Sequence, residues 1–206
     1  MSKIIREACV DTLNDALTAA TKGVERIELC SNLDQDGLTP EFTLAKSVIS
    51  SVDIPVRLMI RTRAGNFNYN TLEIKEMIRQ IDQLKPLKPD GFVLGALTEN
   101  CSIDIATTTS LVMACRPLPV TFHKAIDESP DLIVAIQDLM NINGISHILT
   151  SGGKATANEG AETIRNMLLI SKNHFTIIAA GKITADNLAA HVAMIGVNEY
   201  HGKKIV

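Results

Sequence analysis

The chain has 206 residues, of which 46% are hydrophobic and 21% charged, and its formal net charge is −3. This composition is typical of a globular protein and argues against general disorder. Because like charges do not cluster and only two tyrosines, five phenylalanines and no tryptophan are present, nucleic acid and anionic membranes are not expected as main partners.

Short runs of β-branched residues alternate with longer segments of helical periodicity from one end of the chain to the other. In chain order, we expect eight strands, at residues 4–10, 26–30, 56–61, 91–95, 120–123, 147–151, 176–179 and 198–201. Each strand except the last is followed by a segment long enough to form a helix.

The expected helices show apolar residues at spacings of three and four. Leu13, Leu17 and Ala20 illustrate this in the first helix, and Met77 and Ile81 in the third. The expected helix starts, in chain order, are Asp11 or Thr12, Pro40, Pro130 and Thr184. The expected helix ends are Gly23, Pro86, Gly144 and Gly196.

Alternation of strands and helices predicts a parallel sheet with right-handed crossovers. Eight units predict a TIM-type (β/α)8 barrel that forms a single domain over residues 1–206. An open doubly wound sheet shares this local pattern and remains an alternative. Because few residues follow the last strand, the eighth helix is expected to be truncated or missing. The apolar surface this would leave on the first and last strands predicts a homodimer or larger assembly.

No N-terminal secretory signal, no apolar run long enough to cross a membrane and no CxxC spacing is evident. These features predict a soluble, cytoplasmic protein whose cysteines are free thiols. The cysteines are Cys9, Cys30, Cys101 and Cys115.

Two segments of the form Glu-x-Cys end the first two expected strands. Glu7 and Cys9 project to one face of the first strand, and Glu28 and Cys30 to one face of the second. A buried carboxylate without a partner is costly, so these segments point to a site. Adjacent strands lie about 4.8 Å apart, so cysteines at matching positions would offer two soft sulfurs to one Cu(I) ion. Alternatively, the thiols are small core residues, and the stagger of a closed barrel separates them.

Histidine and arginine side chains follow other expected strands. His123 and His201 each end a strand, where an imidazole acts as acid, base or metal ligand, or is simply a structural histidine. Arg61 and Arg63 project to the same side of an extended segment. They either form ion pairs with the glutamates or hold an anionic ligand.

Two glycine loops follow the sixth and seventh expected strands. Backbone N–H groups of Ser151, Gly152, Gly153 and Gly181 are candidates for binding a phosphate or another anion. Ordinary turns explain the same glycines equally simply. If the protein is an enzyme, we expect a small anionic or phosphorylated substrate at this end of the barrel. The catalytic candidates are then Glu7, Glu28, Arg61, His123 and His201.

An ordered set of motifs spans the chain and resembles the CutC family of copper homeostasis proteins. The motifs are Glu7-Ala8-Cys9, Arg26-Ile27-Glu28-Leu29-Cys30, Gly37-Leu38-Thr39-Pro40, Met59-Ile60-Arg61, Gly95-Ala96-Leu97-Thr98, Thr121-Phe122-His123, Leu149-Thr150-Ser151-Gly152 and Tyr200-His201-Gly202. The resemblance implies a TIM-type barrel in the cytoplasm and a role in copper handling. It also implies that Cys9 and Cys30 match the cysteines from which copper binding in the family is inferred.

Overall fold

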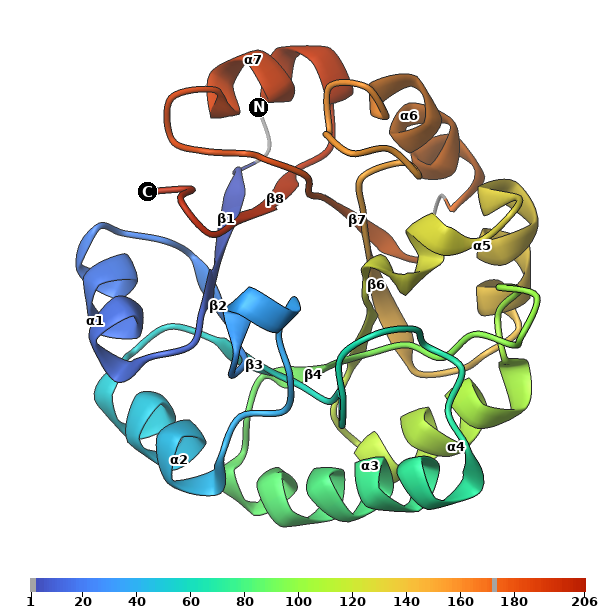
Figure 1. Ribbon diagram of the computed structural model, residues 1–206. Coiled ribbons are helices and arrows are strands. Elements are labelled where there is room, and N and C mark those ends of the chain that lie inside the picture. Colours follow the sequence, from blue (N-terminus) through green and yellow to red (C-terminus); the bar gives the residue numbers. More distant parts are fainter. Residues whose placement is uncertain (1–2, 172–173) are drawn as a thin grey trace.

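The computed structural model describes residues 3–171 and 174–206, and in this part of the chain eight strands alternate with seven α-helices (Figure 1). The strands are β1 (Ile5–Val10), β2 (Arg26–Leu29), β3 (Val56–Met59), β4 (Gly91–Leu94), β5 (Val120–Phe122), β6 (Ile145–Thr150), β7 (Thr176–Ala179) and β8 (Glu199–Gly202). The helices are α1 (Leu13–Thr21), α2 (Phe42–Ser51), α3 (Thr71–Leu84), α4 (Ile105–Cys115), α5 (Leu132–Met140), α6 (Ala161–Ile170) and α7 (Leu188–Ile195).

All eight strands are parallel and pair in chain order, and β1 closes the sheet by pairing with β8. The TIM-type barrel is therefore confirmed, and the open doubly wound sheet is excluded. Short parallel strands buried on both faces favour the β-branched residues that the sequence places there.

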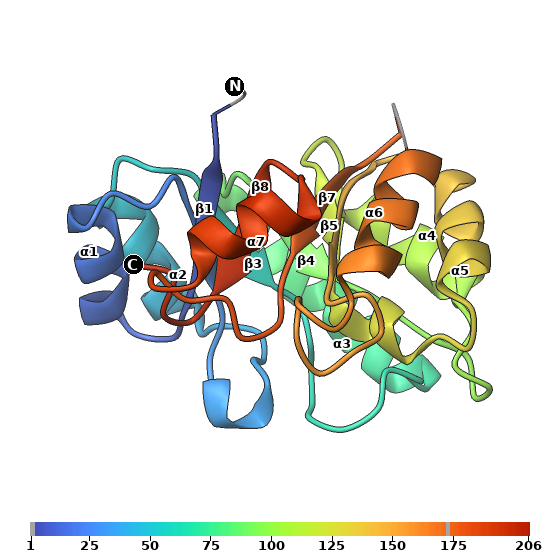
Figure 2. The same cartoon turned by 90° about the horizontal axis from the view of Figure 1, so that it is seen from above.

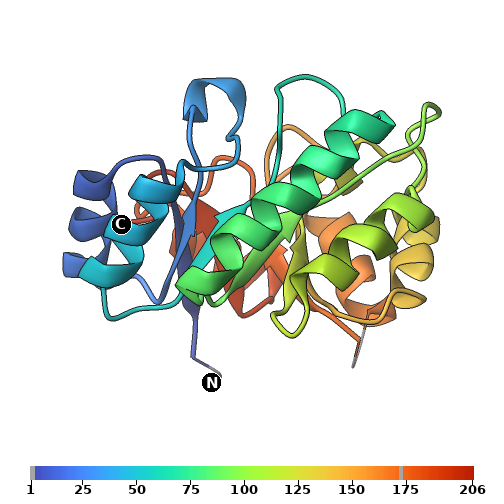
Figure 3. The same cartoon turned by 90° about the horizontal axis from the view of Figure 1, so that it is seen from below.

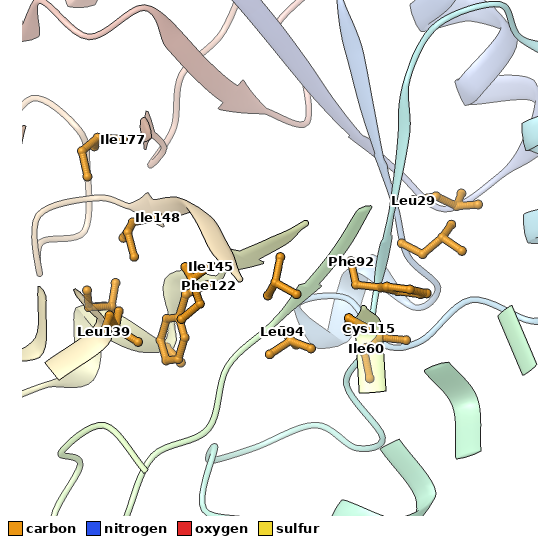
Figure 4. Close-up of a cluster of buried hydrophobic side chains, with 14 of the residues drawn as sticks. Leu29, Ile60, Phe92, Leu94, Cys115, Phe122, Leu139, Ile145, Ile148 and Ile177 are labelled. Carbon is orange, nitrogen blue, oxygen red and sulfur yellow. The ribbon is translucent and has the colours of Figure 1, made fainter. Parts of the chain in front are cut away.

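Strand alternation divides the buried residues between two regions. Outward-facing side chains such as Leu29, Phe92 and Ile148 pack against the surrounding helices (Figure 4). Inward-facing positions carry Glu7, Glu28 and other polar residues, so the apolar core lies between sheet and helices, while the barrel interior is polar.

Some of the expected helix boundaries are confirmed and others are wrong. Thr12 caps α1, since its side chain accepts from Asp15 N, and Gly23 and Gly196 follow helix ends with φ of +81° and +78°. Pro40 does not start α2, which begins two residues later at Phe42. The expected starts of α5 and α7 are also wrong.

Asp131, rather than Pro130, precedes α5, because its carboxylate accepts hydrogen bonds from the backbone N–H groups of Ile133 and Val134. Thr184 forms an isolated bridge with Lys204, and α7 starts later, at Leu188. At α5 a side chain that accepts from the backbone of the first turn sets the boundary more strongly than the proline pattern, whereas α7 starts without a side-chain cap.

The apolar faces of two helices differ in how well the sequence predicts them. Met77 and Ile81 of α3 are fully buried, as expected. In α1 the buried residues are Ala16 and Ala19, and Leu13 packs partly buried against the core, whereas Leu17 is 40% exposed, so the expected face is only partly right. The small alanines permit close approach of α1 to the sheet, which leucine at those positions would prevent.

No eighth α-helix is present in the described residues, and the helix ring is broken between α7 and α1, where the C-terminal end lies (Figure 1). The expected apolar exposure on β1 and β8 is nevertheless wrong, because Ala8, Val10 and Tyr200 are buried. The tail returns over this region and buries Ile205. These strands therefore do not require a partner to cover them, and the homodimer stays a prediction.

The loops at the carboxyl ends of the strands lie at one end of the barrel. The loop after β2, which contains the 3-10 turn Leu33–Gln35, and the loop before α3 project from the same end, opposite the N-terminus (Figures 2 and 3). Functional sites of TIM barrels occur at this end. Among the described helices, none combines the length and the apolar character needed to cross a membrane.

Candidate functional site

Ion pairs fill the end of the barrel interior that lies nearer the N-terminal ends of the strands. Glu7 pairs with the Nε of Arg26 on the neighbouring strand, and its other oxygen lies 2.8 Å from Nδ1 of His201. Arg26 also contacts Glu199 at 2.5 Å. Burial alone would raise the pKa of Glu7, but the charge of Arg26 and the contact with His201 outweigh it and hold that pKa well below its usual range.

A second arginine extends this network across the barrel. Arg57 donates to Oγ1 of Thr121 at 2.8 Å, lies 3.3 Å from Asp90 and contacts Nε2 of His147 at 3.3 Å. His147 is therefore part of the barrel interior. Every charged group here has a partner, which is the arrangement that makes buried charge tolerable.

The two thiols meet above the network. The sulfurs of Cys9 and Cys30 are 4.0 Å apart. The expected matching positions are wrong, however, because the β1–β2 register pairs Cys9 with Glu28 and places Cys30 two residues further along. The thiol of Cys9 donates to Oε1 of Glu28 at 3.3 Å. The hydrogen bond with Cys30 and burial raise the pKa of Cys9 well above its ordinary value.

Three possible metal ligands converge at this point. Ligand atoms of Cys9, Glu28 and His201 all lie within 4.8 Å of one another. Cys30 lies behind Cys9 and is fully buried. The sequence singled out all three residues, Cys9 as a metal ligand and Glu28 and His201 as catalytic candidates, but it did not predict that Glu28 lies closer to Cys9 than Cys30 does, at 3.3 Å against 4.0 Å.

The loop after β2 covers Cys30. Gly37 in this loop has φ of +83°, and a Cβ atom added there would lie 3.2 Å from the sulfur of Cys30. Glycine is thus favoured twice at this position, by the backbone conformation and by the close approach to sulfur. The second thiol is therefore fully buried beneath this loop.

Glu7 and Glu28 both lie beside His201, but their pKa values shift in opposite directions. Nδ1 of His201 contacts Glu7, so Nε2 faces Glu28, 4.0 Å from Oε1. Burial would lower the pKa of His201, but Glu28 and Glu7 raise it above its usual value. The pKa of Glu28 is raised, first by burial and also by the charge of Glu7. Such divergence between neighbouring carboxyl groups is typical of sites that handle protons.

A cavity of about 930 Å³ opens above these residues at the carboxyl ends of the strands. Cys9, Glu28 and His201 line one side of it, whereas Leu149 and Ala180 line another. Five lysines contribute to its lining beside the acidic Asp36, Asp127 and Glu128, and these lysines are Lys124, Lys154, Lys182, Lys203 and Lys204. The cavity thus combines the group formed by Cys9, Glu28 and His201, an apolar wall and an excess of lysines.

His123 lines the cavity as a neutral imidazole. Its Nδ1 accepts a hydrogen bond from Ala125 N at 3.3 Å, which places the ring proton on Nε2. Burial, together with the charge of Arg61, lowers the pKa of His123 to about 3. Phe67 packs against the ring with centroids 4.9 Å apart. His123 therefore presents an N–H donor at neutral pH rather than a charge or a base.

The two predicted arginines hold loops in place. Arg61 donates to carbonyl oxygens of the loop after β2, of which Gln35 is the nearest at 3.1 Å, and to Gly65 O at 2.8 Å. Arg63 lies outside the cavity lining and pairs with Glu73 at 2.5 Å. An anion-binding role thus has geometric support only at Arg61.

The predicted glycine loop already holds an anion, which is the carboxylate of Asp127. One of its oxygens accepts from Gly153 N at 2.9 Å, and the other accepts from Ser151 N at 2.9 Å. Lys124 contacts the same carboxylate at 2.8 Å. Gly152 donates instead to Thr150 Oγ1 at 2.8 Å. An external anion at these amides would have to displace Asp127.

Gly181 lies at the cavity wall in a left-handed conformation. Its φ is +110°, and its carbonyl oxygen accepts from Ala157 N at 2.9 Å. A Cβ atom there would lie 2.8 Å from Ala157 N, so glycine is needed for the loop to pack. Lys182 follows it and brings its charge to the mouth of the cavity.

Sequence reasoning missed several residues of the interior. Arg26 and Arg57 precede Glu28 and Met59 by two positions and so share their inward faces, a signal that strand alternation contains. The lysines at the mouth come from separate loops, and no local pattern brings them together.

Comparison with known proteins identifies relatives over nearly the whole chain. A model described as the CutC family matches residues 4–206. A human protein named copper homeostasis protein cutC homolog is 40% identical over 197 residues, which are 96% of this chain and 72% of that protein. A Pasteurella multocida protein named as family protein CutC is 37% identical over 195 residues, which are 95% of this chain and 80% of that protein.

Solved structures agree with these sequence matches. The crystal structure of a CutC protein from Streptococcus agalactiae covers 98% of this chain and 100% of that one, with a TM-score of 0.93 and 33% identity. Phosphoribosylanthranilate isomerase from Thermotoga maritima covers 97% of this chain and 86% of that one, with a TM-score of 0.59 and 9% identity. At this low identity the second likeness shows the barrel fold alone.

Proposed function

The chain belongs to the CutC family, and from this premise we propose that it acts in copper homeostasis by binding Cu(I) at Cys9 and Cys30. The observation that carries the proposal is the 4.0 Å separation of the two sulfurs. Copper is here the cargo of the protein, and thiolates are the ligands that Cu(I) prefers.

The donor set fits a soft ion. Metal–thiolate bonds of the zinc type are about 2.3 Å long, so two sulfurs that bind one ion lie at most about 4.6 Å apart. The sulfurs of Cys9 and Cys30 meet this limit without movement of the backbone. His201 offers Nε2 as a third ligand when that atom is unprotonated, because its Nδ1 is engaged with Glu7.

The residues around Cys9 also handle the proton that binding displaces. The thiol of Cys9 is protonated at neutral pH, since its pKa is raised. Glu28 lies 3.3 Å from this sulfur and is the nearest acceptor for the proton. Binding of Cu(I) therefore couples to proton transfer toward Glu28 or to the cavity.

Competition against a Cu(I) chelator under anaerobic, reducing conditions tests the proposal. The double variant Cys9→Ser, Cys30→Ser is expected to lose the tight site, and the matched control Cys101→Ser, Cys115→Ser is expected to retain it. Equal affinity of the parent and the Cys9, Cys30 variant would remove the proposed site.

We also propose that the protein is cytoplasmic, as its resemblance to the family implies. We further propose that it forms a homodimer, which the gap in the helix ring between α7 and α1 suggests. Light scattering at micromolar concentration is expected to give the mass of a dimer. A purely monomeric species would overturn the assembly proposal and leave the copper proposal intact.

A second candidate function is that of an enzyme acting on a small anionic or phosphorylated metabolite. The observation that favours it is the cavity of about 930 Å³ with five lysines at its mouth. Thermal stabilisation by inorganic phosphate, weakened in a Lys154→Ala, Lys182→Ala variant, is the expected result. No stabilisation by any anion would count against this candidate.

A further inference from the structure

Three polar atoms that lack a hydrogen-bond partner belong to side chains lining the same cavity. The described residues contain six such buried side-chain atoms, and three of them are Oε2 of Glu28, Nε of Arg61 and Nε2 of His123. These residues are 2%, 4% and 4% exposed. Buried polar groups are nearly always paired in folded proteins, so their concentration at one cavity points to a missing partner.

The chemistry of the three atoms specifies what that partner carries. An ionised Glu28 only accepts hydrogen bonds, so Oε2 requires a donor such as a hydroxyl group. Nε of Arg61 and Nε2 of His123 each carry a hydrogen and require acceptor oxygens. Glu28 lies on β2, and Arg61 and His123 follow β3 and β5. The partner therefore presents a donor toward β2 and acceptors toward the carboxyl ends of β3 and β5.

The remaining walls define the rest of the ligand. Met59, Leu149 and Ala180 offer apolar contact to a carbon skeleton. At the mouth, Lys154, Lys182 and Lys204 form no ion pair with the residues that the structure describes. These charges favour a strongly negative group at the outer end of the ligand, where it remains partly hydrated.

We propose that the cavity binds a phosphorylated hydroxycarbonyl compound, that is, a small molecule with a hydroxyl group next to a carbonyl or carboxylate group and a phosphate at its far end. The hydroxyl donates to Glu28, the carbonyl or carboxylate oxygens accept from His123 and Arg61, and the phosphate lies among the lysines. This inference rests on the second candidate function and names its substrate class. It requires neither copper nor the thiol of Cys30.

Isothermal titration with paired probes tests the ligand class. The panel consists of the phosphoglycerates and the aldose and ketose phosphates of three to six carbons, with inorganic phosphate as reference. At least one member is expected to bind at least tenfold more tightly than inorganic phosphate. For that member, the analogue without the hydroxyl is expected to bind about tenfold more weakly, because the hydrogen bond to a charged carboxylate is lost.

Two variants separate the roles of the residues. In Glu28→Gln, the preference for the hydroxylated probe over its deoxy analogue is expected to fall from about tenfold to near unity, because the charged acceptor is gone. In Lys154→Ala, Lys182→Ala, both probes are expected to weaken by the same factor, and the preference is kept. Lys75→Ala on the outer surface of α3 is the control and is expected to change neither value. A cooperative thermal unfolding transition of each unliganded variant, at a melting temperature no lower than that of the parent by more than a few degrees, establishes that it is folded.

The outcomes distinguish this inference from the functions proposed above. If inorganic phosphate binds but no organic phosphate in the panel binds more tightly, the hydroxycarbonyl class is wrong while the anion site stands. If no anion binds, both are wrong. The Cys9→Ser, Cys30→Ser variant is expected to lose Cu(I) and keep the organic phosphate, and loss of both would overturn the independence of the two sites.

Discussion

The two halves of the barrel interior contain the same kinds of residue and differ in whether their hydrogen bonds are complete. Toward the N-terminal ends of the strands, Glu7, Arg26 and Glu199 satisfy one another. Toward the carboxyl ends, Glu28 and His123 each retain a buried atom without a partner. A buried charge network whose members are all paired is tolerated and is costly to break, whereas one left open is available to a ligand. Polar composition alone therefore does not locate a site.

Breaking the closed half should produce the largest effect. Arg26→Leu leaves Glu7 and Glu199 buried without their cation, and we expect the free energy of unfolding to fall by about 3–5 kcal/mol. Urea denaturation measures this change. The control Arg79→Leu breaks an exposed pair with Glu76 and should cost no more than about 1 kcal/mol. Similar values for the two variants would show that the interior network is not stabilising.

The pH dependence of copper affinity tests the open half. Because the pKa of Cys9 is raised, a proton must leave its thiol when Cu(I) binds. Apparent affinity should therefore rise with pH between 6 and 8, by about tenfold per pH unit for each proton released. Chelator competition at several pH values measures the slope. A flat profile would mean that binding does not use this thiol as thiolate.

Replacing the open carboxylate should affect stability far less than removing Arg26. Burial raises the pKa of Glu28 in the folded chain, so the group favours folding below its unfolded pKa and opposes it as pH rises. We expect Glu28→Gln to change the free energy of unfolding at pH 7 by no more than about 1 kcal/mol, toward greater stability. Denaturation at pH 4.5 and 7 should show that the benefit grows with pH. A loss of several kcal/mol would place Glu28 in the closed network.

The smallest expected effect concerns His123, which we expect not to titrate between pH 5 and pH 8. The pKa of His123 is lowered to about 3, so its Cε1–H resonance should stay constant from pH 8 to pH 5. The resonance of His201 should move, with a midpoint above 6.5, because Glu28 and Glu7 raise its pKa. NMR of the unliganded protein, with single His→Gln variants for assignment, measures both. A midpoint for His123 near 6.5 would remove its role as a neutral donor.

The sequence allowed the fold and the residue types of the site to be predicted, because strand alternation places Glu28 and Cys30 inward whatever the detailed register. The register itself depends on closure of the whole barrel, so the pairing of Cys9 with Glu28 did not follow from either strand alone. Likewise, Asp127 fills the glycine loop from a different loop, 24 positions before Ser151. Local sequence patterns do not specify such contacts between distant loops, so these features of the site could not be predicted.

The close packing of Gly37 against the sulfur of Cys30 has a kinetic consequence. The loop that holds Gly37 is fixed by three carbonyl oxygens that accept from Arg61, so exposure of the second thiol requires those bonds to open together. An ion captured by Cys9 from the cavity would then reach Cys30 without loop opening, while a large chelator or a protein acceptor would have to wait for it. We therefore expect a substitution at Gly37 to change the rate at which bound Cu(I) leaves Cys30 more than it changes the affinity.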